Sequence, residues 1–128
     1  MTNHQLNDKK VFDIYERSFN FAVSVAVFLK KIPNNDINAV YKKQLARSSA
    51  SIGANLSEAD GSLTKRDFVN KVGIARREAR ESGHWLKLIR QISIRKNSEL
   101  YHEINVIIQE AHELLLILSR IILKSKRI

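Results

Sequence analysis

The stretch ASIGANLSEADGS, residues 50–62, combines a helical pattern with an unusual number of small side chains. Ile52, Leu56 and Ala59 recur at the spacing of one helical face, which predicts that this face packs into a core. Gly61 follows, and glycine commonly stands just after the last turn of a helix. The stretch therefore predicts the C-terminal part of a helix, and the other elements can be placed outward from it.

Three sequence signals divide the chain into helical segments. Residues 30–36, KKIPNND, contain the only proline and three residues that can cap a following helix. Thr64 with Asp67 three positions later resembles a capping box at the start of the next helix. Residues 92–100 contain basic residues that suit the end of one helix, and Asn and Ser residues that suit the start of another. These signals predict helices at residues 8–32, 36–60, 65–94 and 98–125.

The composition and the short connections predict one all-α domain. One proline and four glycines in 128 residues are too few for the many turns of a loop-rich all-β fold. Helices joined by short connections are usually neighbours that run antiparallel. We therefore predict an antiparallel up-down-up-down four-helix bundle that occupies residues 1–128 as a single domain.

A second face of the 36–60 helix carries only small side chains. Its members are Ala39, Ala46, Ala50, Gly53 and Ser57. This face permits another helix to approach closely, either within the bundle or in a second subunit. Glycine inside a helix costs about 1 kcal/mol relative to alanine, so a close contact at Gly53 is expected to offset that cost. We interpret Ser51 and Asn55 as polar groups that set the register between helices, with a ligand-facing Asn55 amide as the alternative.

The first and last predicted helices carry more apolar surface than one bundle core requires. One stripe of the first helix consists of Val11, Tyr15, Phe19, Ala22, Ala26 and Leu29, and a second consists of Ile14, Phe21, Val25, Phe28 and Ile32. Outside its core stripe, the last helix carries Leu116, Ile117, Ile121 and Leu123. Large exposed apolar patches are rare on monomers, so this excess predicts a homo-oligomer. The alternative is a monomeric bundle with scattered apolar residues on its surface.

Trp85 is the most prominent residue of the predicted interface between subunits. It lies off the core stripe of its helix, near Ile74, where an indole ring can anchor an interface or serve as a stacking platform. The residues that we assign to this interface are Ile74, Trp85, Ile117 and Ile121.

The charge of the chain is concentrated on the 65–94 helix. The formal net charge is +9 and the isoelectric point is near 10.0, which favours an anionic partner such as nucleic acid or a membrane surface. Solubility alone is the alternative explanation. Seven basic residues share one broad side of this helix, with His84 among them: Lys65, Arg66, Arg76, Arg77, Arg80, Lys87 and Arg90. Arginine and lysine at helical spacing suit contacts with phosphates, so we assign these residues to a nucleic-acid-binding face.

A competing explanation of the basic face is internal pairing. The 98–125 helix carries acidic residues that share one face, and they could pair with the basic helix of the same subunit or of a neighbour. These residues are Glu99, Glu103, Glu110 and Glu113. No recognition helix or zinc finger accompanies the basic residues, so any nucleic acid is expected to be recognised by charge and shape.

The sequence offers little for catalysis, for metal binding or for a membrane. No cysteine is present, which excludes thiolate sites and fits a reducing cytoplasm. His102-Glu103 and His112-Glu113 lack the second histidine of a zinc-protease motif, and no glycine-rich phosphate loop occurs. The most apolar run, residues 21–29, is about half as long as a membrane span, and the N-terminus does not resemble a signal peptide. We expect a non-catalytic cytoplasmic protein without cofactor, metal or membrane partner.

Two blocks of the sequence resemble the four-helix bundle protein family, which includes proteins encoded in intervening sequences of bacterial large-subunit rRNA genes. The blocks are QLARSSASIGANLSEADGS at 44–62 and RDFVNKVGIARREARESGHWLKLI at 66–89. The residues that match are Gln44, Leu45, Arg47, Ser51, Ile52, Asn55, Glu58 and Gly61 in the first block and Asp67, Phe68, Ala75 and Glu78 in the second. The chain departs from the family pattern where Leu56 and Ser57 replace Ile-Ala and where Ala59 and Asp60 interrupt Glu-Gly.

The resemblance implies a cytoplasmic bacterial protein that assembles into a ring-like homopentamer. The chain is also similar to the accessory variability protein of diversity-generating retroelements, a basic pentamer that binds nucleic acid and works with a reverse transcriptase. On that basis we expect a nucleic-acid-binding accessory protein that binds RNA or DNA and assists a reverse transcriptase. The alternative is a structural scaffold oligomer encoded in an rRNA intervening sequence, whose partner is another protein.

Overall fold

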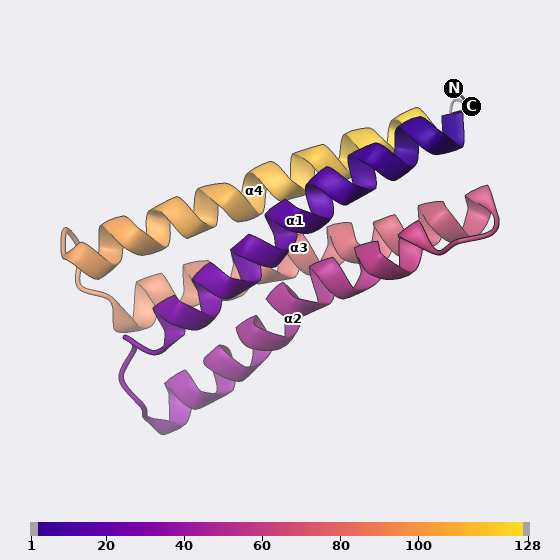
Figure 1. Ribbon diagram of the computed structural model, residues 1–128. Coiled ribbons are helices and arrows are strands. Elements are labelled where there is room, and N and C mark those ends of the chain that lie inside the picture. The colour runs from indigo at the N-terminus through magenta and orange to yellow at the C-terminus, as the bar shows by residue number, and fades with distance from the viewer. Residues whose placement is uncertain (1–2, 127–128) are drawn as a thin grey trace.

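Four long helices make up the computed structural model, which describes residues 3–126, with side chains from residue 13 onward. The helices are α1 (Asn3–Leu29), α2 (Asp36–Asp60), α3 (Lys65–Ser93) and α4 (Glu99–Lys126). Figure 1 shows them packed side by side, with the start of α1, the end of α4 and the α2–α3 connection at one end of the bundle. Residues 3–126 contain no strand. The prediction of an all-α fold with four helices is confirmed.

The helix boundaries follow the capping signals of the sequence. The Asn35 side chain accepts a hydrogen bond from the Asn38 N–H at 2.8 Å, and the Thr64 hydroxyl accepts one from the Asp67 N–H at 3.1 Å. Ser98 caps α4 in the same way through the Tyr101 N–H. These bonds satisfy backbone donors that have no partner within the helix, so α2, α3 and α4 begin within one residue of their predicted starts.

The end of α1 differs from the prediction. The helix stops at Leu29, three residues early, and the Lys31 and Ile32 N–H groups instead donate to Phe28 and Leu29 in a tighter turn. Pro33 has no N–H to donate to the Leu29 carbonyl and disfavours helical backbone at Ile32, so the helix does not continue through this point. The turn still buries Ile32, so the apolar stripe continues into the core beyond the helix.

Burial shows that the second of the two apolar stripes predicted for α1 faces the core. Ile14, Phe21, Val25 and Phe28 are buried, whereas Phe19 of the other stripe is 55% exposed. Val11 of that other stripe lies outside the described side chains. The largest fully buried side chains come from all four helices: Phe28, Leu45, Ile52, Leu56, Leu86, Ile89, Ile104, Leu114, Leu118, Val25 and Val72.

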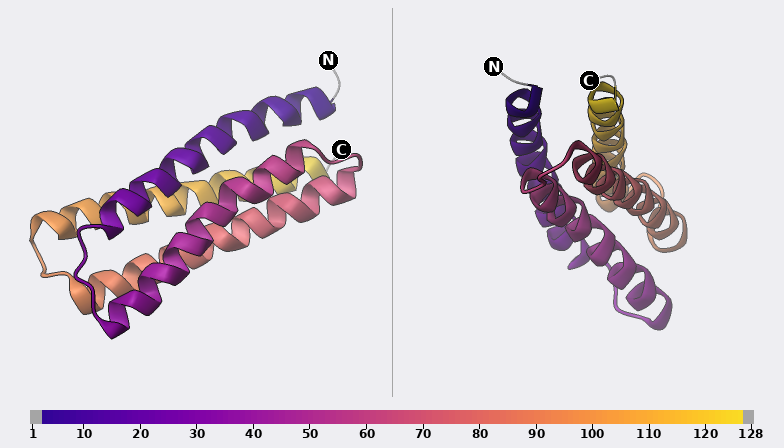
Figure 2. Two further views of the ribbon diagram at one scale, coloured as in Figure 1. Left: turned by 60° about the horizontal axis from the view of Figure 1, so that its bottom comes forward. Right: turned by 90° about the vertical axis from the view of Figure 1, so that its right-hand side faces the viewer.

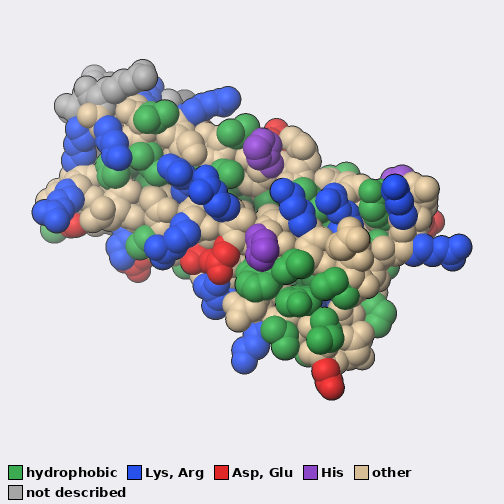
Figure 3. Space-filling view, turned by 180° about the vertical axis from the view of Figure 1, so that it is seen from behind, with side chains coloured by type: hydrophobic (Ala, Val, Ile, Leu, Met, Phe, Trp, Pro, Cys, Tyr) green, Lys and Arg blue, Asp and Glu red, His purple; other side chains and the backbone are tan. Residues whose placement is uncertain are grey.

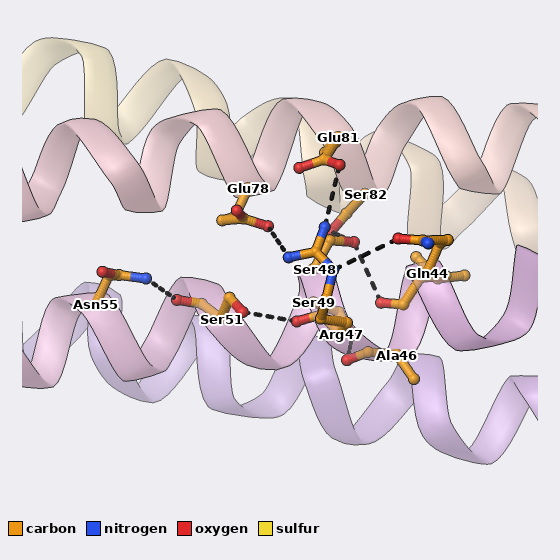
Figure 4. Close-up of polar contacts among 11 residues, drawn as sticks. Gln44, Ala46, Arg47, Ser48, Ser49, Ser51, Asn55, Glu78, Glu81 and Ser82 are labelled. Atoms are coloured by element: carbon orange, nitrogen blue, oxygen red, sulfur yellow. Dashed lines mark hydrogen bonds and ion pairs between the residues drawn. The ribbon is translucent and has the colours of Figure 1, made fainter.

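The hydrogen bonds that Ser51 and Asn55 donate do not set the register between helices, and the alternative of a ligand-facing Asn55 amide stays a prediction. The Ser51 hydroxyl donates to the Arg47 carbonyl and the Asn55 amide donates to the Ser51 carbonyl, both within α2 (Figure 4). Short polar side chains in helices often bond back to a carbonyl four residues earlier, which uses their donor locally. The hydroxyls of Ser48 and Ser82 make the contact between helices instead, at 2.9 Å and fully buried.

The small stripe of α2 lies against α1 at one point. A Cβ atom built on Gly53 would lie 3.3 Å from the Ser18 hydroxyl oxygen and 3.9 Å from the Tyr15 ring. Gly53 therefore permits the close approach of α1 within the bundle. Ala39, Ala46, Ala50 and Ser57 of the same stripe are exposed.

Candidate nucleic-acid interface

The predicted basic residues lie along α3 on the side away from the core. Lys65, Arg66, Arg77, Arg80 and Lys87 are exposed, and Arg76 and Arg90 are half-buried. Figures 1 and 2 place α3 and α4 together on one side of the bundle. Figure 3 views the molecule from that side and shows Lys and Arg side chains spread across it, with His side chains among them.

Three of the four acidic residues of α4 pair with α1 or with the residues just after it. Arg17 donates two hydrogen bonds of 2.7 Å to Glu110 and lies 3.4 Å from Glu113. Lys31, just after α1, pairs with Glu103 at 2.9 Å. The hydrogen bonds to Glu110 raise the pKa of Arg17 further above its ordinary value, so Arg17 stays protonated at any working pH. The predicted alternative, in which α4 neutralises α3, is therefore wrong within one subunit for these three glutamates, and pairing with a neighbouring subunit stays a prediction.

Two of the three carboxylates of α3 are held on the α2 side, and the third, Asp67, is exposed in the first turn. Arg47 of α2 contacts Glu78 at 3.3 Å and Glu81 at 3.1 Å (Figure 4). Glu78 is 8% exposed, so this contact compensates a nearly buried charge. Among the residues that the structure describes, none of the seven predicted basic side chains of α3 takes part in an ion pair. Arg90 alone of the seven has a side-chain partner there, the Asn105 oxygen at 2.7 Å.

A groove of about 420 Å³ lies between α3 and α4 beside these residues. Polar side chains from both helices line it: Arg80, His84, Lys87, Gln109 and His112. Apolar and small residues complete the lining: Ala79, Gly83, Ile108, Ala111 and Leu115. No carboxylate belongs to this lining, so the groove favours an anion.

His112 and Gln109 are the residues of this groove that the sequence did not associate with the basic face. Both come from α4, and only the packing of α4 on α3 brings them beside Arg80 and Lys87. His112 is exposed, as is His84 across the groove. Their position depends on the register between two helices, which no local sequence signal encodes.

The four predicted interface residues do not lie together in the structure. Trp85 stacks on Tyr41 of α2 with ring centroids 5.8 Å apart, and it packs against the core together with other partly buried residues. Ile117 and Ile121 line a hollow between α1 and α4, where Ile121 is only 5% exposed. Ile74 is half-buried on α3. The assignment of these residues to contacts between subunits stays a prediction.

Two classes of site find no support in the described residues. None of the four helices has an apolar stretch of the length that a bilayer crossing requires. Within the same residues, no group of three or more His, Asp or Glu side chains is arranged to hold a metal ion.

The fold and its charges define a basic four-helix bundle. The family model of the 23S rRNA-intervening sequence proteins matches residues 10–119, and the chain belongs to this family. The predicted family is thereby confirmed. A crystal structure with the same fold is that of a protein of unknown function from the S23 ribosomal protein family of Bacteroides thetaiotaomicron VPI-5482. It shares 32% identity over 88% of this chain and 97% of its own, with a TM-score of 0.77. No curated protein gives a significant match.

Proposed function

We propose that this protein is a non-catalytic, oligomeric accessory protein that binds RNA or DNA through the basic face of α3. The contacts are made to phosphates, so recognition depends on charge and backbone shape more than on base sequence. The protein acts in the cytoplasm and needs no cofactor.

The separation of charge around α3 is the observation that carries this proposal. Glu78 and Glu81 are engaged by Arg47, and Glu103, Glu110 and Glu113 are engaged by α1 and the residues just after it. The basic side chains that remain are exposed or half-buried along one helix. Guanidinium and ammonium groups repeated at this spacing suit successive phosphates of a nucleic-acid backbone.

The proposal includes assembly and a partner. Neighbouring helices are antiparallel in each subunit, and the subunits form a ring-like homopentamer that assists a reverse transcriptase, as the family resemblance implies. Apolar residues that are about half exposed on α1 and α2, among them Phe19, Val23 and Val40, support association of copies. A ring repeats the basic face, which multiplies the phosphate contacts available to one strand.

Fluorescence anisotropy with labelled RNA and DNA oligonucleotides at about 0.1 M salt tests this function. The double variant Arg66→Glu, Arg77→Glu reverses two exposed charges and should weaken binding by about 10- to 100-fold. The control variant Lys30→Glu, Lys43→Glu makes the same change of net charge at exposed residues outside α3 and should weaken it less than about threefold. Equal weakening by both variants, or no binding by the wild-type protein, would overturn the proposal.

A structural scaffold that binds another protein is the second candidate function. The exposed apolar side chains of α1 and α2 favour it, because Phe19, Ile37 and Val40 are each 55% exposed. A stable oligomer in sedimentation experiments that binds no nucleic acid at low salt would support the scaffold over the accessory protein.

A further inference from the structure

The groove between α3 and α4 has the chemistry of a site for one strand of nucleic acid. Arg80, His84 and Lys87 stand four and three residues apart, so they share one wall of the groove and span about 10 Å along α3. His112 and Gln109 of α4 face them from the other wall. The side chains around the groove are therefore cationic or neutral, and several of them donate hydrogen bonds.

Small residues give the groove its depth. Ala79, Gly83 and Ala111 belong to its lining, and a Cβ atom built on Gly83 would lie 4.0 Å from the Ala111 Cβ atom. The backbones of α3 and α4 are thus near ordinary contact at this point without any bulky side chain between them. Ile108 and Leu115 add an apolar surface on the α4 side. The flat apolar part of a ligand can contact this surface while an anionic group of the same ligand reaches Arg80 or Lys87.

His84 belongs to an aromatic series that begins in the neighbouring helix. Its ring meets Trp85 edge-on with centroids 5.0 Å apart, and Trp85 stacks on Tyr41. These contacts hold the His84 ring beside the groove. The rings that line the groove itself are those of His84 and His112, while Trp85 and Tyr41 lie outside its lining. Proteins bind single strands where bases can stack on rings and phosphates can meet cations, and the groove offers both kinds of group.

We propose that this groove binds a nucleotide of a single-stranded RNA or DNA, with the base on its apolar lining and the phosphate against Arg80 and Lys87. The inference rests on the proposed function and makes it specific, because it gives the protein a preference for single strands. A duplex keeps its bases stacked and paired, so placing one of them in the groove would require unstacking. The rest of the basic face binds single strands and duplexes alike.

Filling the groove tests the proposal. Gly83→Leu replaces a glycine with a better helix former and places a large side chain in the groove. Gly73→Leu is the matched control on the same helix, because a Cβ atom there meets nothing within 4 Å. We expect Gly83→Leu to weaken binding of a single-stranded oligonucleotide by about tenfold and to leave binding of the matching duplex unchanged. Gly73→Leu should change neither.

A second variant tests the groove in case Gly83→Leu disturbs the fold. His84→Ala with His112→Ala removes two exposed side chains of the groove, and His102→Ala removes an exposed histidine elsewhere on α4. The double variant should lose about tenfold in single-strand affinity at an unchanged melting temperature, whereas His102→Ala should bind as the wild type does.

The outcomes separate this inference from the proposed function. Wild-type binding to single strands and duplexes with equal affinity, or an unchanged preference in both groove variants, would overturn the groove assignment while the basic face stands. An absence of binding to either nucleic acid at low salt would overturn both.

Discussion

The two sides of α3 differ in whether their polar side chains have partners within the protein. Toward α2, Ser82 meets Ser48 at 2.9 Å and Arg47 engages the nearly buried Glu78, although the buried Trp85 Nε1 has no hydrogen-bond partner among the described residues. Toward α4, Arg80 and Lys87 remain exposed beside a groove whose lining includes no carboxylate. One helix therefore has one side that holds the bundle together and another that can meet a ligand.

The difference follows from what burial does to polar groups. A buried hydroxyl or carboxylate without a partner costs free energy, so Ser82 and Glu78 on the α2 side have partners within the molecule. Exposed cations are hydrated and carry no such cost, so they need not be neutralised internally. We expect substitutions on the α2 side to change stability and substitutions on the α4 side to change binding.

The largest effect is expected at the fully buried hydroxyl contact between α2 and α3. Ser82→Leu forces a larger side chain into a fully buried position and removes the bond to Ser48, and should lower the free energy of unfolding by about 2–4 kcal/mol. Urea denaturation measures this change, with Ser82→Ala at about 1 kcal/mol as the control without overpacking. A midpoint like that of the wild type would contradict tight packing there.

A smaller effect on stability is expected for Arg47. A substitution there should change stability and not RNA binding, whereas a substitution of a basic residue of α3 should change RNA binding and not stability. Arg47→Ala leaves Glu78 nearly buried without its partner and should lower the free energy of unfolding by about 1–2 kcal/mol, with RNA affinity unchanged. Arg77→Ala should instead weaken RNA binding and change stability by less than about 0.5 kcal/mol. Denaturation and anisotropy measurements on both variants check this. A loss of RNA affinity in Arg47→Ala would contradict the division of α3 into a stabilising side and a binding side.

The smallest effect is expected at the glycines of α3. Gly83→Ala and Gly73→Ala should each raise the free energy of unfolding by about 0.5–1 kcal/mol, because alanine favours the helix and both positions have room for a Cβ atom. Thermal unfolding should show an increase of about 2–6 °C for each. A lower melting temperature for Gly83→Ala alone would mean that α3 and α4 pack more tightly than their 4.0 Å contact indicates.

Much of the fold could be predicted because its signals are local. Asn35 and Thr64 mark helix starts through their side-chain hydrogen bonds, and the starts of α2 and α3 follow them closely. Gly61 follows the end of α2 as predicted, although its φ of −85° is one that any residue adopts. The two apolar stripes of α1 could not be ranked, since both have helical spacing and only the packing of Ile14 and Phe21 decides between them. Helix α1 does not continue through Pro33, which has no N–H to donate and disfavours helical backbone at the residue before it.

The candidate site could be predicted on one helix but not across two. Helical spacing placed Arg80 and Lys87 on one side of α3, which the structure retains. The spacing could not show that Glu110 would pair with Arg17, because each helix of a bundle has two neighbours and the sequence does not say which neighbour a face meets. For the same reason His112 was not associated with the groove.

The salt dependence of RNA affinity tests the central claim that the α3 face is free to bind phosphates. In anisotropy titrations across a salt series, the logarithm of the association constant should fall linearly with the logarithm of salt concentration. We expect a slope of about −3 or steeper on a single strand for the wild type, and a slope shallower by about 1–2 for Arg66→Glu, Arg77→Glu. A wild-type slope near zero, or the same slope in that variant, would contradict the claim.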